Sequence, residues 1–157
     1  METKEQKFWS LFKQQSFVDV FNSGGYLNDL LEVLSEDEID FLVKKNVVFI
    51  RSTSPSSTIT IPKIEANGEL ILINFDHNCF KHLLPEEAIS IILHEIGHVI
   101  NPELKGMEAE YAADAFAASK GDFAKWNISA LKKGSDKGWI GFEKNECEMR
   151  IKKMYEN

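Results

Sequence analysis

The spacing of apolar residues predicts helices in the first part of the chain. Aromatic and aliphatic residues recur at helical spacing over residues 8–21, so we expect an N-terminal helix with an aromatic face, interrupted at residues 23–25. Ser35 and Glu38 are spaced as a capping box, which predicts a second helix from 36 to about 45.

Three short segments rich in β-branched residues follow. Residues 47–51 and 58–64 are predicted as strands on either side of a Ser/Thr/Pro loop over 52–57. The turn pair Asn67-Gly68 introduces a third strand over 69–75. Together they predict a sheet of about three strands. The third strand is either a plain core strand or an edge to which an extended peptide could add.

A long apolar helix is predicted over residues 85–100. Pro85 suits the first helical turn, where its missing N–H is not needed, and Glu86 and Glu87 favour the positive end of the helix dipole. The segment continues without a breaker to Asn101-Pro102, which is a stop signal.

This helix carries the pentapeptide HEIGH at residues 94–98. At 3.6 residues per turn, His94 and His98 share one face with Cβ atoms about 5–6 Å apart, so two imidazoles can bind one ion. Glu95 lies about 100° round the helix and can face the open side of a metal without being a ligand. A chance HExxH match is expected only about 0.01 times in a chain of this composition. The alternative is a metal-free core in which carboxylates satisfy both histidines.

A second helix, rich in alanine, is predicted over residues 107–118, ended by Gly121. Glu110 and Asp114 are four residues apart and share a face, while the small residues permit close helix packing. An antiparallel pair joined by a loop of about six residues would bring that face against the two histidines.

A catalytic zinc site uses three protein ligands and leaves one position for water. We expect His94, His98 and Glu110 to bind one Zn²⁺ per chain, with Glu108 as the rival to Glu110. Asp114 is expected to accept the free imidazole N–H of His94 and so fix its tautomer. Zinc is the metal most often held by such a donor set, and manganese, iron and cobalt stay open.

These residues resemble a family of enzymes. HEIGH followed by Glu110-x-x-x-Asp114-x-x-Ala117 is similar to the gluzincin class of HExxH zinc metallopeptidases, and most similar to the small ImmA/IrrE-like and minimal gluzincin proteins. The resemblance covers about residues 94–118. It implies an α+β, small zincin-like fold, in which the sheet precedes the HExxH helix and the second ligand-bearing helix. It also implies peptide hydrolysis by a zinc-activated water, with Glu95 as general base.

Residues 123–133 and 142–155 are predicted to form closing helices around a loop over 134–141. Residues 148–154 resemble the helix that closes some related peptidases, where an arginine steadies the tetrahedral intermediate; the resemblance implies that role for Arg150. An ordinary amphipathic helix with solvated charges is the alternative.

A second donor to the developing oxyanion usually helps such a reaction. His77 and Arg150 are our candidates for this transition-state stabiliser. The other side chains that we consider are His82, Tyr111 and Tyr155.

The length of 157 residues favours a single domain over 1–157, large enough to bury about two-thirds of its unfolded surface. We expect four parts: an N-terminal helical part (1–45), the sheet (46–84), the zinc-site helices (85–121) and the C-terminal helices (122–157).

The net charge is −7, but residues 120–157 carry 9 basic and 6 acidic side chains, which leaves −10 on the first 119. This charge disfavours nucleic acid as a partner. Cys79 and Cys147 lack CxxC spacing, and neither a signal peptide nor an apolar run of about 18 residues is present. We therefore expect a cytoplasmic protein with no membrane partner.

The predicted function is that of a zinc-dependent metalloendopeptidase acting on a peptide or protein substrate. One alternative is an ImmA/IrrE-like regulatory protease specific for one repressor partner. The other is a zinc-stabilised binding module without catalysis.

Overall fold

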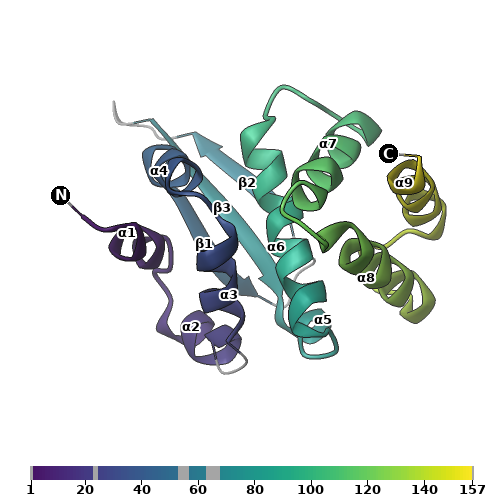
Figure 1. Ribbon diagram of the computed structural model, residues 1–157, viewed down its shortest axis with the longest axis horizontal. Coiled ribbons are helices and arrows are strands. Elements are labelled where there is room, and N and C mark those ends of the chain that lie inside the picture. The colour runs from purple at the N-terminus through teal and green to yellow at the C-terminus, as the bar shows by residue number, and fades with distance from the viewer. Residues whose placement is uncertain (1, 23–24, 53–56, 63–67, 157) are drawn as a thin grey trace. The chain divides into compact units, whose positions relative to one another are not determined.

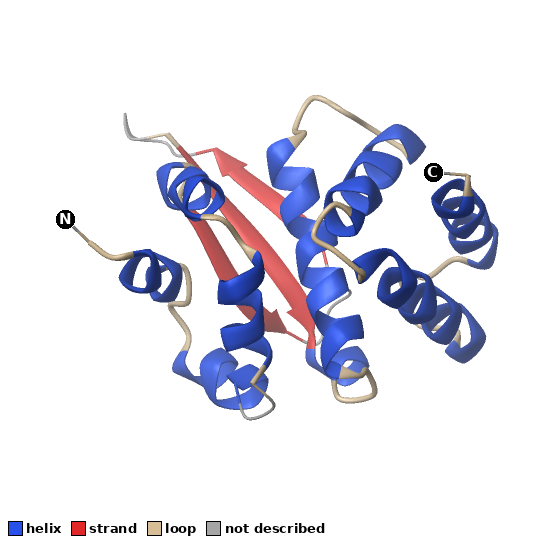
Figure 2. Cartoon of the chain, viewed as in Figure 1, coloured by secondary structure: helices blue, strands red, loops and turns tan. Residues whose placement is uncertain are grey.

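The computed structural model describes residues 2–22, 25–52, 57–62 and 68–156, and the chain divides into two compact units, Met1–His77 and Asn78–Asn157. The α+β class is confirmed, with a mixed sheet of three strands (Figures 1 and 2). The single-domain organisation stays a prediction.

The sheet lies in the first unit. It consists of β1 (Val47–Ser52), β2 (Ser57–Pro62) and β3 (Glu69–Asp76) in the order β1-β3-β2. β1 is parallel to β3 and β2 is antiparallel to it. The interpretation of the third strand as an edge is therefore wrong, because β3 is the central strand and is paired on both sides. The predicted continuation of the second strand beyond residue 62, and Asn67, lie outside the described residues.

Four helices precede or flank this sheet in the first unit, at the purple-to-blue end of Figure 1: α1 (Lys4–Ser10), α2 (Gln15–Asn22), α3 (Tyr26–Val33) and α4 (Glu36–Lys44). The capping box that opens α4 is confirmed. The Ser35 hydroxyl accepts from the Glu38 N–H at 3.2 Å, and the Glu38 carboxylate accepts from the Ser35 N–H at 2.8 Å.

The single N-terminal helix expected over residues 8–21 is wrong, because the chain leaves the helix between α1 and α2. There the Leu11 carbonyl accepts the Phe49 N–H at 3.0 Å, and the Gln14 side chain accepts the Arg51 N–H at 2.9 Å. These bonds to β1 outweigh local helix propensity. The break also stacks Phe12 on Phe49, with ring centroids 4.8 Å apart, in the core of this unit. Ser23 and Gly24 of the expected interruption lie outside the described residues.

The second unit is helical apart from its connecting loops. After the short α5 (His77–Phe80), which begins at the last residue of the first unit, come α6 (Pro85–Ile100), α7 (Met107–Ala118), α8 (Phe123–Lys137) and α9 (Lys144–Tyr155). α6 contacts α7 and α8, and α9 contacts α7 and α8 (Figure 1). The predicted bounds of the two helices that carry the candidate ligands, 85–100 and 107–118, are confirmed.

The loop predicted over 134–141 is wrong at its start, because α8 continues through Gly134 to Lys137. A Cβ on Gly134 would lie 2.3 Å from the Phe142 ring, so glycine leaves the space that this aromatic side chain fills. The helix instead ends at Gly138, whose φ of 64° is left-handed and favours glycine.

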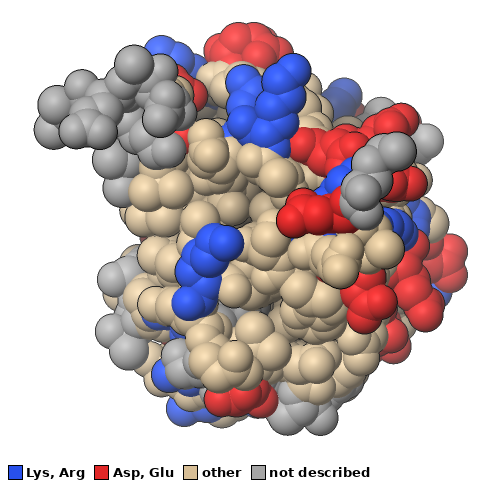
Figure 3. All heavy atoms as spheres, turned by 90° about the vertical axis from the view of Figure 1, so that its left-hand side faces the viewer, with Lys and Arg blue, Asp and Glu red and all other residues tan. Residues whose placement is uncertain are grey.

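The surface carries both signs of charge. On the face shown in Figure 3, acidic side chains gather mainly to one side of an area of uncharged atoms, with fewer basic side chains among them. No helix in the described part of the chain is long and apolar enough to cross a membrane.

Candidate metal centre

α6 is a buried helix that places both motif histidines on one side. Its first turn is fixed by Pro85 and by the Glu87 carboxylate, which accepts the Leu84 N–H at 2.8 Å. Glu87 is only 1% exposed, and it also accepts the Ser129 hydroxyl at 2.7 Å and pairs with Lys133, both on α8. The N-terminal turn of α6 is thus anchored to α8.

α7 packs closely against α6 at Gly97, inside the HEIGH motif. A Cβ on Gly97 would lie 2.6 Å from the Ala113 Cα, so only glycine permits this approach. Residues 101–106 return the chain, and α7 runs back beside α6 (Figure 1). The close packing brings the face that carries Glu110 and Asp114 against the histidines.

Three potential ligand atoms meet between these two helices. The Nε2 atoms of His94 and His98 are 3.1 Å apart. His94 Nε2 lies 3.2 Å from Glu110 Oε2, and His98 Nε2 lies 3.4 Å from Glu110 Oε1. Taking one donor atom from each residue, all three lie within 4.8 Å of one another, a group that could hold a metal ion.

The spacing of these atoms is compatible with a divalent metal ion such as zinc. Bonds of about 2.0–2.1 Å at tetrahedral angles place neighbouring donor atoms about 3.3 Å apart. The 3.1 Å between the two Nε2 atoms and the 3.2 Å from His94 Nε2 to Glu110 Oε2 lie close to this value, while the 3.4 Å contact of His98 is made with the other carboxylate oxygen, Oε1. Two imidazoles and one carboxylate are also the donor set of catalytic zinc sites that keep a position for water.

Asp114 lies directly behind the histidine pair and is 2% exposed. Its Oδ1 is 2.8 Å from His94 Nδ1, as expected from the sequence. Because an ionised carboxylate only accepts hydrogen bonds, His94 carries hydrogen on Nδ1, and its Nε2 lone pair can bind a metal. The same Oδ1 accepts from Asn127 Nδ2 of α8 at 2.8 Å.

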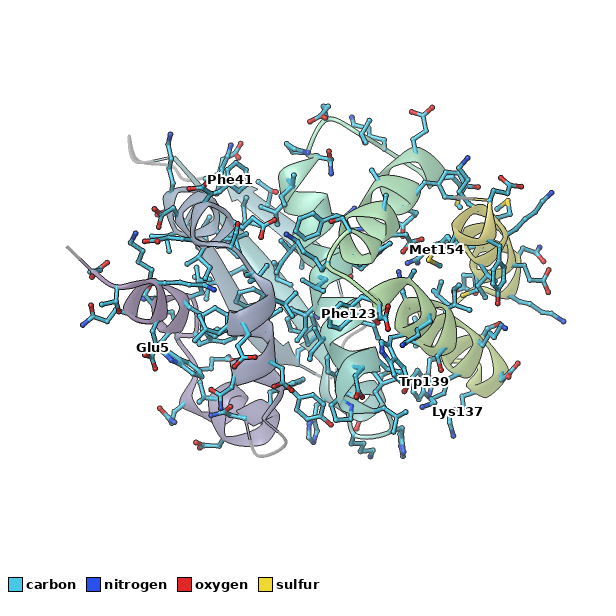
Figure 4. All side chains as sticks on the ribbon, in the orientation of Figure 1. Glu5, Phe41, Phe123, Lys137, Trp139 and Met154 are labelled. Atoms are coloured by element: carbon cyan, nitrogen blue, oxygen red, sulfur yellow. The ribbon has the colours of Figure 1, made fainter. Side chains whose placement is uncertain are left out.

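Arg150 of α9 completes the cluster, and its side chain is only 7% exposed. Its Nε donates to Asp114 Oδ2 at 2.8 Å and its Nη2 to Asp114 Oδ1 at 2.7 Å, a bidentate pair. Its Nη1 lies 3.1 Å from Glu110 Oε2. The carboxylates of Asp114 and Glu110 and the guanidinium of Arg150 therefore form one network with the two histidines. In Figure 4 the labelled Met154 lies on the side of α9 that faces α7 and α8.

This network separates the pKa values of the two histidines. Burial and the Arg150 charge lower the pKa of His94, but the hydrogen bonds to Asp114 and Glu110 outweigh them and raise it above 6.5. Burial, together with the His94 charge, lowers the pKa of His98 to about 4. The pair therefore takes up one proton much more readily than a second.

The carboxyl groups stay ionised. Burial alone raises the pKa of Asp114, but hydrogen bonds from Arg150 and His94 bring it far below its usual range. Burial also raises the pKa of Glu110, and the contacts with His94 and the Arg150 charge lower it overall. Both side chains are thus anionic near neutral pH, as a metal ligand and its supporting acceptor must be.

The other sequence candidates lie in different surroundings. Glu95 is a buried residue of α6, whereas Glu108, the rival ligand, is exposed at the start of α7. Tyr155 is 69% exposed. His82 is exposed and stacks on Trp139, with ring centroids 6.2 Å apart.

His77 belongs to the first unit, and its role stays a prediction. Tyr111 is half-buried on α7, next to Glu110. Cys79 and Cys147 are both buried, and neither is joined in a disulfide.

Sequence reasoning missed Asn127 and the actual partners of Arg150. Asn127 shares the buried face of α8 with Leu131 and Gly134, spaced by four and seven residues. A polar residue at such a core-facing position needs a buried hydrogen-bond partner. This pattern could have predicted that Asn127 belongs to a buried polar cluster.

Comparisons of the chain with models of known protein families, with curated proteins and with solved structures give no match.

Proposed function

We propose that this protein is a zinc-dependent metalloendopeptidase whose α6 and α7 form a small zincin-like site. The observation that carries the proposal is the convergence of His94, His98 and Glu110 at spacings that suit zinc, within an HExxH motif.

In this proposal His94 and His98 hold zinc through Nε2, and Glu110 holds it through its carboxylate. Bound zinc would supply a Lewis acid that polarises the peptide carbonyl and lowers the pKa of a water to about 7. Asp114 keeps His94 in the tautomer with a free Nε2, through the 2.8 Å contact to Nδ1.

Glu95 is the general base. The oxygen of a water adds to the carbonyl carbon of the scissile peptide while the Glu95 carboxylate accepts one of its protons. The carbon–nitrogen bond then breaks, and Glu95 passes that proton to the leaving nitrogen, which departs as an amine. No side-chain nucleophile is needed, so neither buried cysteine takes part.

Metal analysis combined with peptide cleavage tests the proposal. Zinc-loaded wild type, Glu95→Gln and the control Glu103→Gln, an exposed residue of the α6–α7 connection, are incubated with a diverse peptide library and the products identified by mass spectrometry. We expect about one zinc per chain in all three. Wild type and the control should cleave, while Glu95→Gln should lose about 10²–10⁴-fold in rate.

The other outcomes are equally informative. Absence of bound zinc after metal-replete purification contradicts the proposal. Zinc binding with no difference between wild type and Glu95→Gln indicates a zinc-stabilised binding module. Cleavage of one folded repressor, with the peptide library untouched, narrows the function to a regulatory protease.

A further inference from the structure

Arg150 is positioned to act on the protein's own carboxylates. It comes from the last helix, and three of the groups nearest to its guanidinium are acidic: Asp114, Glu110 and Glu146, the last at 3.9 Å. A guanidinium has five N–H donors in a rigid plane, and the edge formed by Nε and Nη2 is taken by Asp114.

The arrangement also fixes where the guanidinium can point. Moving it to meet a substrate oxyanion would break a buried bidentate pair and leave Asp114, 2% exposed, without its strongest partner. The geometry therefore disfavours the transition-state role that the sequence resemblance implies for this residue.

We infer that Arg150 is a positioning residue that preorganises the metal site through Asp114 and Glu110. This inference rests on the proposed metal centre. Through Asp114, Arg150 fixes the carboxylate that orients His94. Through the 3.1 Å contact of Nη1 with Oε2, it holds the third ligand in place before metal arrives.

Two effects of Arg150 on metal affinity oppose each other. Its positive charge repels a cation, whereas its hydrogen bonds place Glu110 and Asp114. The charge is offset by the carboxylates that surround it, so positioning is the larger effect. Losing such a supporting partner typically weakens metal binding about 10–100-fold.

The inference extends to the whole of α9. The three proposed ligands lie on α6 and α7, and α9 supplies Arg150. The support of Glu110 and Asp114 is therefore complete only when α9 is packed on α7 and α8. Metal binding should in turn slow amide hydrogen exchange in α9.

The test compares full-length wild type with Arg150→Gln, Arg150→Lys, Asp114→Asn and the double variant Asp114→Asn/Arg150→Gln. Lys153→Gln is the matched control, because this exposed lysine of the same helix pairs with Glu156, 3.8 Å away. Zinc affinity is measured by competition with a chromophoric chelator, and the visible spectrum of the Co²⁺ form reports the coordination. Exchange in α9 is followed with and without zinc, and circular dichroism checks folding.

Arg150→Gln should bind zinc about 10–100-fold more weakly, with an altered Co²⁺ spectrum and loss of the metal-dependent protection of α9. Arg150→Lys should recover part of the affinity, because it keeps the charge but not the bidentate geometry. The double variant should lose less affinity than the sum of the two single losses, because only the contact of Arg150 with Glu110 is left to lose once Asp114 is replaced. Lys153→Gln should match wild type.

The inference is overturned if both Arg150 variants keep the wild-type zinc affinity and Co²⁺ spectrum while their cleavage rate is reduced. That result would assign Arg150 a role on the substrate. Additive losses in the double variant would also contradict action through Asp114. If Arg150→Gln does not fold, the same two readouts on Arg150→Lys decide. Failure of wild type to bind zinc is a separate result, which contradicts the proposed function itself.

Discussion

The Asp114 carboxylate of α7 lies 2.8 Å from Nδ1 of His94 on α6. This contact joins the two helices at the candidate metal centre and sets which imidazole nitrogen is free to bind a metal. It depends on how closely the helices approach, on the protons that the histidines carry and on the anchoring of α6. Each of these can be tested.

Gly97→Ala should disrupt the site by forcing α6 and α7 apart. The added methyl would lie 2.6 Å from the Ala113 Cα, a backbone atom that cannot turn aside. Overpacking of this kind typically costs about 1–3 kcal/mol of unfolding free energy. Zinc affinity should also fall, because Glu110 and Asp114 move with α7. Urea unfolding and zinc titration measure the two effects.

Gly134→Ala is the control for that substitution. Its methyl would meet the Phe142 ring at the far end of α8, so stability should fall in this variant too. Zinc affinity should stay near wild type once the protein is folded. Equal losses of zinc affinity in the two variants would show that the close approach at Gly97 has no specific part in the site.

Zinc affinity should depend on pH through His94. The pKa of His94 is raised above 6.5, and that of His98 is lowered to about 4, so between these values the metal-free pair holds one proton, on His94. That proton must leave Nε2 when metal binds. Affinity should therefore fall about tenfold per pH unit as pH drops below the His94 pKa, and more steeply below about pH 4.

Calorimetric titration of zinc in two buffers with different ionisation enthalpies counts the protons released. About one proton per zinc is expected near pH 6. Release of two protons near pH 6 would mean that both imidazoles are charged in the metal-free protein. Release of no proton would mean that the His94 imidazole is neutral there. Either result contradicts the network around His94.

Lys133→Met should destabilise the fold at the start of α6. It leaves the Glu87 carboxylate, 1% exposed, without its cationic partner, and loss of one hydrogen-bond partner of a buried group typically costs about 1–3 kcal/mol. Lys137→Met is the control, because this exposed residue of the same helix should matter by at most about 1 kcal/mol.

The same pair should shape acid unfolding. Burial raises the pKa of Glu87, but the contacts with Lys133, the Leu84 N–H and Ser129 lower it below its ordinary value of 4.5. A depressed carboxyl pKa adds stability above about pH 4.5 that is lost as pH falls through the folded value. The stability difference between wild type and Lys133→Met should therefore shrink below pH 4.5. A difference that stays constant from pH 7 to pH 3 would show that Lys133 acts by packing alone.

The elements around the site could be predicted because their signals are local. Pro85, the stop at Asn101-Pro102 and the apolar run between them define α6 without reference to the rest of the fold. The four-residue spacings place His94 with His98, and Glu110 with Asp114, on shared faces. The expectation that these two faces meet followed from the short connection between α6 and α7 and from the small residues of α7.

The position of Arg150 could not be predicted in the same way. Arg150 lies 36 residues from Asp114 and 56 from His94, and its place depends on how α9 packs on α7 and α8. The break between α1 and α2 was missed for the same reason, since it is stabilised by hydrogen bonds from β1 and no glycine or proline marks it. Tertiary contacts decide both features.

The most direct test of the metal centre is the zinc affinity of wild type, Glu110→Gln and Glu108→Gln, measured side by side. The two substitutions remove one carboxylate each from the same turn of α7, one against the histidines and one exposed. The site described here predicts about one tightly bound zinc in wild type and Glu108→Gln, with affinity lost in Glu110→Gln. Unchanged binding in Glu110→Gln, or its loss in Glu108→Gln alone, would contradict it.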